Sequence, residues 1–178
     1  ILTTSPAMDI LKSSNIERVI YSLYGAQRTK ELMDDLNDKN IFQLSKNETD
    51  TLQKYFSAIN SDDTYGAKII KEFLDDNYLM DPHTATCIKA YDKLKEKELK
   101  TVIYSTAEWT KFSPTVLNAL NENNDKYSDK DALEEISSKN TKTKKKSIKE
   151  LFNAKINHST IIEKENIESE IVKFIRES

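Results

Sequence analysis

The side chains best placed for chemistry follow a short β-branched run, Val102–Tyr104, which is typical of a buried parallel strand. Ser105 and Thr106 come directly after this run, and Lys111 lies just before an expected helix start. In open α/β sheets, ligands bind at the carboxyl ends of strands, close to helix N-termini. Backbone amides and the lysine charge favour an anion there. The pattern alone does not identify a ligand, because any βα unit can end in Ser-Thr.

Other chemistry-bearing residues are few and widely spaced. The two histidines, His83 and His158, and the single cysteine, Cys87, give no metal-ligand spacing. No Ser-His-Asp arrangement has support in the sequence. We therefore expect no metal site. The lone cysteine excludes an internal disulfide and indicates a reducing compartment, which favours the cytoplasm.

Composition restricts the class of partner. The chain has 178 residues, of which 37% are hydrophobic and 32% charged, the balance of a globular protein with its own core. A formal charge of −3 and a pI near 5.6 argue against nucleic-acid or anionic-membrane partners. No apolar run approaches the ~20 residues that span a bilayer. We expect neither a nucleic-acid nor a membrane partner.

The elements that position these side chains are expected to be mostly helical, because the chain has only 2 Gly and 3 Pro. The fold class predicted is α/β, predominantly helical with one or two short strands, at Ile1-Leu2 and Val102–Tyr104. Apolar residues at helical spacing predict helices over about 16–36 with an interruption at Gly25, then over 48–59, 63–74, 82–97, 113–120, 131–137 and 167–175.

Three helix starts carry specific signals. Asp81-Pro82 and Ser113-Pro114 each combine a capping side chain with a proline at the first helical position. Ser61–Asp63 supplies capping side chains for the helix that follows it.

The second half of the chain becomes polar between residues 121 and 147, which predicts a surface excursion with a solvated basic turn at Lys142–Lys146. We expect residues 1–121 to belong to one body and residues 122–178 to be this excursion and terminal helices packing on it. The chain begins at Ile1, without methionine and inside an apparent strand. This start predicts a piece of a longer protein.

Three separated motifs resemble those of threonine synthase, in the order that family shows them. They are TTSPAMDI…SSNIER (Thr3–Arg18), YLMDPHTAT (Tyr78–Thr86) and STAEWTKF (Ser105–Phe112). Each is moderately specific, and the ordered trio is highly specific. The resemblance covers at least residues 1–121 and continues more weakly into the tail.

The resemblance implies the C-terminal part of a fold type II enzyme, similar to the tryptophan synthase β subunit. Such an enzyme is a carbon–oxygen lyase that converts O-phospho-L-homoserine and water to L-threonine and phosphate with pyridoxal 5'-phosphate. The family's Schiff-base lysine and glycine-rich phosphate loop lie earlier in its chain, and neither is recognisable here. The resemblance therefore implies that these residues are inert without a missing N-terminal part of the same chain.

The resemblance also implies roles for individual residues. Thr106 matches the family threonine whose hydroxyl faces the pyridine nitrogen of the cofactor, and Ser105 lies beside it. Lys111 matches a lysine that we assign to an anionic group of the substrate. The alternatives that remain are a strand-end Thr106 that caps the following turn and a solvent-facing Lys111.

Substrate contacts are also implied for Ser5, Asn15, Arg18 and His83. Arginine is the natural bidentate partner of phosphate or carboxylate, although a helix cap and a salt bridge explain Asn15 and Arg18 equally well. A structural role at the helix start is the alternative for His83.

One dipeptide departs from the family pattern. Many members have His-Pro where this chain has Glu108-Trp109, which leaves the roles of these two positions open. Two other interpretations are another fold type II enzyme, such as threonine dehydratase, and a non-catalytic helical interaction domain. A paralogue that has lost catalysis is a close neighbour of the second.

Overall fold

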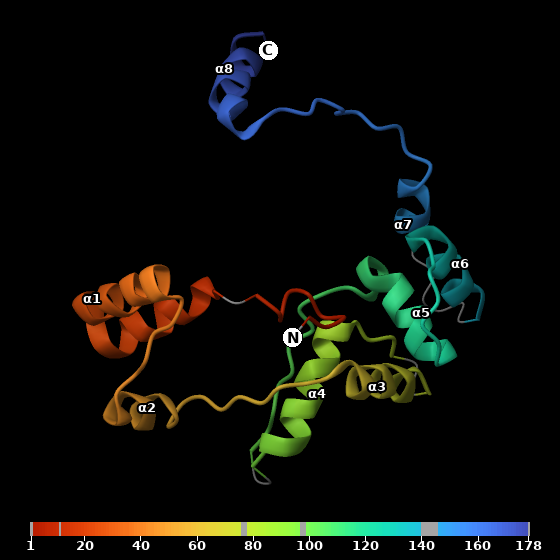
Figure 1. Cartoon of the computed structure of the whole chain (residues 1–178). Coiled ribbons are helices and arrows are strands. Elements are labelled where there is room, and N and C mark those ends of the chain that lie inside the picture. The colour runs from red at the N-terminus through yellow and green to blue at the C-terminus, as the bar shows by residue number, and fades with distance from the viewer. Residues whose placement is uncertain (1, 11, 76–77, 97–98, 140–145, 178) are drawn as a thin grey trace. The chain divides into compact units, whose positions relative to one another are not determined.

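A computed structural model of the chain describes residues 2–10, 12–75, 78–96, 99–139 and 146–177 (Figure 1). The regular elements in these ranges are all helices. The chain forms two compact units, residues 1–144 and 145–178. The expected division at residue 121 concerns the body of a whole enzyme and stays a prediction. No helix in the described part of the chain is both long and apolar enough to cross a membrane.

The first helical segment, α1 (Ser14–Lys39), is two helices that meet at Gly25. Gly25 has φ 79° and ψ 174°, a conformation essentially restricted to glycine. Ile20 before the bend and Leu32 after it are both buried, and the Thr29 hydroxyl donates to the Gly25 carbonyl (2.8 Å). The predicted interruption at Gly25 is confirmed.

A short helix, α2 (Lys46–Leu52), follows and starts with a capping box between Ser45 and Glu48. Arg28 of α1 donates to both carboxylate oxygens of Glu48 (2.7 and 3.1 Å). The guanidinium of Arg28, and then the backbone amide of Ser45, lower the pKa of Glu48 to about 2. This ion pair joins α2 to the second half of α1.

The helix expected to continue from residue 48 to Ile59 ends at Leu52 instead. Tyr55, Phe56 and Ile59, whose spacing suggested the longer helix, are exposed. Most helical stability comes from packing of an apolar face, and a short segment without such packing is marginal.

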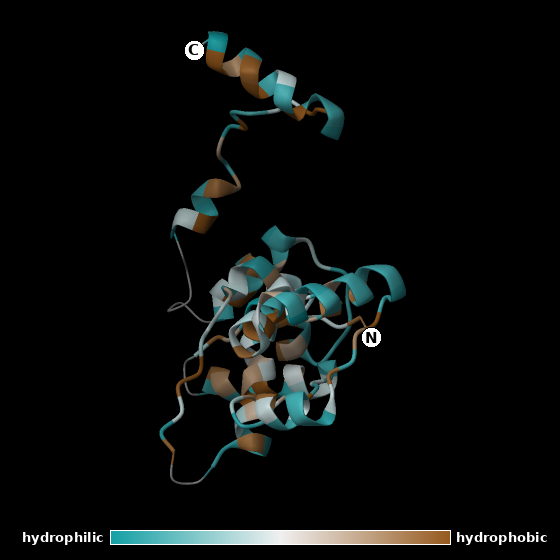
Figure 2. Cartoon of the chain, turned by 90° about the vertical axis from the view of Figure 1, so that its left-hand side faces the viewer, coloured by the Kyte–Doolittle hydropathy of each residue, from teal (hydrophilic) through white to brown (hydrophobic). Residues whose placement is uncertain are grey.

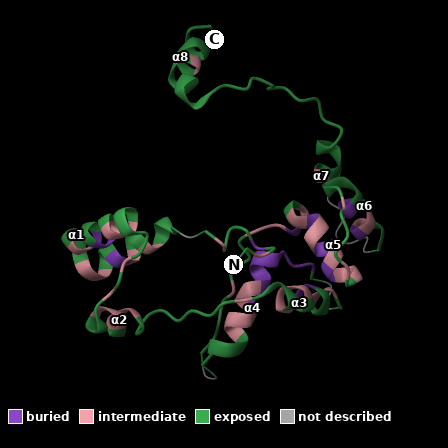
Figure 3. Ribbon diagram, viewed as in Figure 1, coloured by how far each residue is buried: buried purple, intermediate pink, exposed green. Residues whose placement is uncertain are grey.

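The core of the first unit is built from α3 (Asp63–Asp75), α4 (Pro82–Leu94), α5 (Ser113–Asn121) and α6 (Asp129–Lys139). Helix α3 packs against α4 and α5, and α5 packs against α6. The 3-10 turn η1 (Trp109–Phe112) packs against α5 and α6. Buried residues gather in these elements (Figure 3). The apolar ones include Ile69, Ile70, Ile88, Trp109, Val116, Leu117, Leu133 and Ile136.

Two of the three predicted caps are confirmed. Asp62 accepts the Tyr65 amide at the start of α3 (2.9 Å), and Asp81 accepts the His83 and Thr84 amides at the start of α4 (2.9 and 3.2 Å). The third is wrong, because Ser113 is already helical and its hydroxyl donates to the Asp129 carbonyl (2.9 Å). That bond joins the start of α5 to the start of α6.

The strands are not confirmed. None of the described residues lies in a strand, and Val102–Tyr104 is without regular structure, with Val102 and Tyr104 largely exposed. A β-branched run becomes a strand only when a neighbouring backbone pairs with it. Leu2 is likewise exposed and outside any strand, and Ile1 lies outside the described residues.

The polar stretch after residue 121 contains the expected short helix, α6, but this helix is not a surface excursion. Ala132, Leu133 and Ile136 of α6 are buried. The polar composition of this stretch predicted an exposed segment, although these three apolar residues share one face of the helix. Of the predicted basic turn Lys142–Lys146, positions 142–145 lie outside the described residues.

The second unit contains α7 (Lys146–Leu151), the 3-10 turn η3 (Lys164–Asn166) and α8 (Ile167–Glu177). The predicted amphipathic terminal helix is confirmed in α8, whose apolar and polar sides are visible in Figure 2. Its apolar residues Ile167, Ile171, Phe174 and Ile175 are exposed.

Replacement of Gly25 with alanine is expected to lower the free energy of unfolding by about 1–3 kcal/mol. A Cβ added at Gly25 meets no atom within 4 Å, so the whole cost comes from the backbone conformation. Urea denaturation followed by circular dichroism measures the change.

Gly66→Ala is the matched control. Gly66 is helical in α3 and its added Cβ also meets no atom within 4 Å. Alanine at this position is expected to stabilise by about 0.5–1 kcal/mol. Stabilisation by both substitutions would contradict the proposed bend at Gly25.

Candidate functional site

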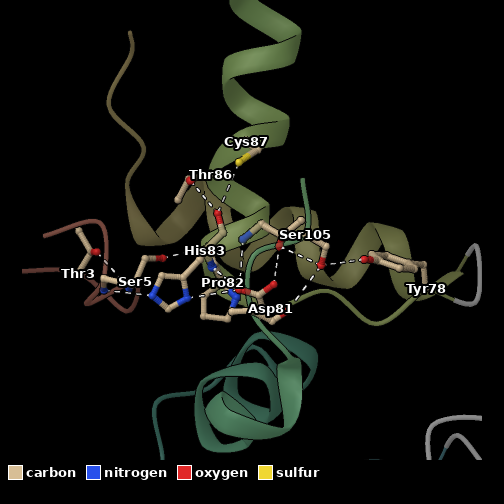
Figure 4. Close-up of polar contacts among 12 residues, drawn as sticks. Thr3, Ser5, Tyr78, Asp81, Pro82, His83, Thr86, Cys87 and Ser105 are labelled. Carbon is tan, nitrogen blue, oxygen red and sulfur yellow. Dashed lines mark hydrogen bonds and ion pairs between the residues drawn. The ribbon is translucent and has the colours of Figure 1, made fainter. Parts of the chain in front are cut away.

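Segments from all three sequence motifs meet at the first turn of α4 (Figure 4). We call this group of side chains the α4 cluster and define it as Ser5, Asp81, His83, Thr84 and Ser105. All except Ser105 are at least nine-tenths buried. The cluster therefore joins residues separated by up to 100 positions in the sequence.

The carboxylate of Asp81 is the acceptor at the centre of the α4 cluster. Its Oδ1 accepts the His83 and Thr84 amides, and its Oδ2 accepts the Thr84 hydroxyl in a short hydrogen bond. The first amides of a helix have no partner within the helix and carry a partial positive charge. A carboxylate is therefore the strongest cap for this buried turn.

His83 connects the helix start to the first motif. Its Nε2 accepts the Ala7 amide (3.1 Å), and its Nδ1 lies 3.3 Å from Asp81 Oδ1. Its ring lies against the Phe112 ring, with centroids 4.5 Å apart and planes tilted by 53°. The ring thus has neighbours from all three motifs.

Two sets of hydrogen bonds fix the loop Thr3–Asp9. The Asp9 carboxylate accepts the backbone amide and the hydroxyl of Thr3 (2.6 and 2.9 Å), which closes the loop on itself. The Ser5 hydroxyl donates to the Pro82 carbonyl (3.0 Å) and so attaches the loop to α4.

Ser105 belongs to a chain of hydroxyl groups. The Tyr78 hydroxyl donates to Ser105 Oγ (3.3 Å), and Ser105 Oγ lies within hydrogen-bond distance of Thr84 Oγ1 (3.4 Å). Ser105 is itself exposed, so the chain of hydroxyls runs from the buried carboxylate of Asp81 to the surface. The sequence motifs contain Tyr78 and Thr84, but their types alone gave no sign of this contact.

Thr106 and Lys111 belong to the same sequence motif as Ser105, and both are exposed. The Thr106 hydroxyl makes no hydrogen bond to any described residue. Thr106 lines a groove of about 470 Å³ together with α4 residues and the run Val102–Tyr104. The predicted alternative, in which Thr106 caps the following turn, is therefore not observed.

Asn15 and Arg18 lie at the start of α1 and bond to each other, with Arg18 Nη1 donating to Asn15 Oδ1 (3.2 Å). Both are exposed, and none of the described contacts brings them to the α4 cluster. The predicted alternative of a cap and a salt bridge is not seen among the described residues, because the N-cap of α1 is Ser13 without a side-chain cap bond and Arg18 bonds to the neutral amide of Asn15.

The two positions that depart from the family pattern have structural neighbours. Trp109 is 4% exposed and belongs to the core, where η1 packs against α5 and α6. Glu108 precedes η1, and its carbonyl accepts the Lys111 amide (3.0 Å). Burial of Trp109 explains a large apolar residue at this position.

A second hollow lies between α3 and α5 and has a volume of about 740 Å³. Lys71 and Glu122 form a short ion pair across it, and Thr4 bonds to Asp63 at its edge (2.8 Å). The sequence gave no signal for this hollow, since its walls come from two separate helices. No group of histidine, cysteine and acidic residues in the described ranges can hold a metal.

The chemistry available at the α4 cluster is that of neutral hydroxyl groups. None of the described cluster hydroxyls donates to the His83 ring, so the cluster offers no nucleophile paired with a base. Exposed Ser105 and Thr106, with Lys111 nearby in sequence, present donors to a bound molecule. Donors of this kind can bind and orient a ligand, and the assignment of one belongs to the proposal below.

No family model matches the sequence. The comparisons with curated proteins and with solved structures agree on one family. Threonine synthase-like 1 from Homo sapiens is 36% identical over 121 residues, which are 66% of this chain and 16% of that protein. Threonine synthase from Saccharomyces cerevisiae is 29% identical over 164 residues, 81% of this chain and 32% of that protein. The chain thus spans a minor part of the length of these relatives.

Solved structures give the same result. A pyridoxal-phosphate-bound threonine synthase from Brucella melitensis matches with a TM-score of 0.63 and 34% identity, over 67% of this chain and 26% of that one. Yeast threonine synthase matches the fold over 100% of this chain and 37% of its own, with a TM-score of 0.77 and 24% identity. The resemblance that the three motifs indicate is therefore confirmed in sequence and in fold, and this chain is a homologue of part of a threonine synthase.

Proposed function

We propose that this chain is part of a pyridoxal-phosphate-dependent threonine synthase, a lyase that forms L-threonine and phosphate from O-phospho-L-homoserine and water. The observation that carries the proposal is the meeting of the three family motifs at the first turn of α4. Ser5 reaches Pro82, Ala7 reaches His83, and Phe112 lies against the same ring. Motifs that resemble a family by coincidence would have no reason to converge.

Thr106 fits a cofactor contact. Its hydroxyl is exposed and makes no bond to a described residue, so it is available to the pyridine nitrogen. Pyridoxal phosphate, when bound, supplies an electron sink for carbanion chemistry. A neutral hydroxyl does not hold the pyridine nitrogen protonated as an aspartate would, which makes the sink milder. Ser105 precedes Thr106 and ties this segment to Tyr78 and to the cluster.

Among the proposed substrate contacts, the two cations, Lys111 and Arg18, suit the anionic groups of the substrate best. Both are exposed and are therefore accessible to an anionic ligand. Asn15 holds the guanidinium of Arg18 in place. Ser5 and His83 are buried and already bonded to backbone groups, which favours a supporting role for these two.

The chain alone is proposed to be inert. It contains 2 glycines, too few for a glycine-rich phosphate loop, and the family's cofactor lysine belongs to an earlier segment. The remaining part of the same polypeptide is therefore the required partner. A cytoplasmic location stays a prediction from cysteine usage.

The full gene product, supplied with pyridoxal phosphate, is expected to bind the cofactor and to release phosphate and threonine from O-phospho-L-homoserine. Cofactor binding is read from visible absorbance, and threonine is quantified by chromatography. Full-length protein that binds the cofactor and instead deaminates threonine would point to a dehydratase. A full-length protein that shows neither cofactor binding nor turnover would contradict the proposal.

Thr106→Val in the full gene product is expected to shift the cofactor absorbance and to reduce turnover by roughly tenfold, because one hydrogen bond of ~1.5 kcal/mol is lost. The substitution conserves shape, so the far-ultraviolet circular dichroism should not change. Thr106→Ser retains the hydroxyl and is the matched control. An unchanged spectrum and rate in Thr106→Val would remove Thr106 from the site.

A further inference from the structure

His83 is buried, and its ring is contacted from three directions. Only 3% of the residue is exposed. The Ala7 amide donates to Nε2 (3.1 Å), Asp81 Oδ1 lies 3.3 Å from Nδ1, and the Phe112 ring lies against the imidazole. Both ring nitrogens therefore face groups of this chain.

These contacts define which nitrogen carries the proton. A nitrogen that accepts the Ala7 amide has its lone pair free, so the proton of a neutral imidazole lies on Nδ1. Nδ1 is buried and makes no well-aligned hydrogen bond, although the Asp81 carboxylate is 3.3 Å away. The negative charge of Asp81 favours a proton on the nitrogen that faces it. Nε2 then remains unprotonated and can accept the Ala7 amide.

The Ala7 bond and the Ser5 bond attach the loop Thr3–Asp9 to α4 side by side. Ser5 donates to the Pro82 carbonyl and Ala7 donates to the neighbouring His83 side chain. The bond from Ser5 has a backbone carbonyl as its acceptor, and a carbonyl is present whatever side chain lies at that position. The other needs an acceptor at the distance of Nε2, which depends on the side chain at position 83.

We propose that His83 is a positioning residue: its Nε2 accepts the Ala7 amide and holds the loop Thr3–Asp9 against the first turn of α4 and the Phe112 ring. In this role His83 does not touch the substrate. Only the purpose of the positioned loop, to complete a wall of the substrate site, rests on the proposed function.

Two substitutions separate the Nε2 contact from the rest of the ring. The carbonyl of glutamine can occupy the place of Nε2, whereas the shorter asparagine reaches only the place of Nδ1. Both remove the aromatic contact with Phe112. A role limited to packing predicts similar behaviour of the two variants, while the positioning role predicts that only His83→Gln retains the loop contact.

Amide exchange at Ala7, followed by nuclear magnetic resonance in the full gene product, measures the contact directly. We expect the Ala7 amide to be protected in the parent and in His83→Gln, and to exchange about fivefold faster in His83→Asn, the factor for one hydrogen bond of ~1 kcal/mol. Equal exchange in the two variants, or an unprotected Ala7 amide in the parent, would overturn the proposal.

If a variant fails to fold, the proposal is tested on the parent protein by the ¹⁵N spectrum of its His83 imidazole. This spectrum distinguishes a nitrogen that carries a proton from one that accepts a hydrogen bond. A signal for unprotonated Nε2 supports the proposal, and a neutral ring protonated at Nε2 contradicts it.

Turnover of O-phospho-L-homoserine gives the functional arm. His83→Asn is expected to raise KM about fivefold with a smaller change in kcat, and His83→Gln to restore KM. A parent protein without turnover contradicts the proposed function, while the exchange of Ala7 still decides the role of His83. An equal loss of kcat in both variants, with KM unchanged, would contradict the positioning role.

Discussion

The buried carboxylate of Asp81 is the constraint on which the arrangement of the first unit depends. It accepts two backbone amides and one hydroxyl in the first turn of α4, and it lies beside Nδ1 of His83. A buried charge is tolerated only when its oxygens are fully paired. The same pairing fixes the direction of the first turn of α4 and the place of Thr84, and the charge of Asp81 favours a proton on Nδ1 of His83. The loop Thr3–Asp9 and the segment of Ser105 then attach to positions that are already defined.

Local signals in the sequence predicted the parts of this arrangement that local chemistry decides. Asp81 followed by proline predicted the start of α4, and Gly25 predicted the bend in α1, because a cap and a positive φ are properties of one or two residues. The motif order predicted the family through resemblance. The expected ends of the helices were less accurate, as α2 and α4 show, since tertiary packing decides how far a helix extends.

The sequence patterns did not predict contacts between residues that are far apart in the sequence. Ser113 bears the signature of a cap, yet its hydroxyl bonds to the Asp129 carbonyl, 16 residues away in the sequence. Trp109 departs from the family pattern and is a core residue. The β-branched run Val102–Tyr104 has the composition of a strand, but strand formation requires a partner outside the described residues of this chain. Of the predicted site residues, Ser5, His83 and Ser105 meet in one cluster, whereas Asn15 and Arg18 bond to each other elsewhere.

Hydrogen exchange followed by mass spectrometry in Asp81→Ala, compared with the parent and with Ser45→Ala, tests the central role of Asp81 most directly. Ser45→Ala removes an exposed cap at α2 and is the matched control. We expect Asp81→Ala to increase exchange in the first turn of α4, in the loop Thr3–Asp9 and in the segment Ser105–Phe112 together, and Ser45→Ala to leave all three unchanged. Faster exchange confined to the first turn of α4 would contradict the central role of Asp81.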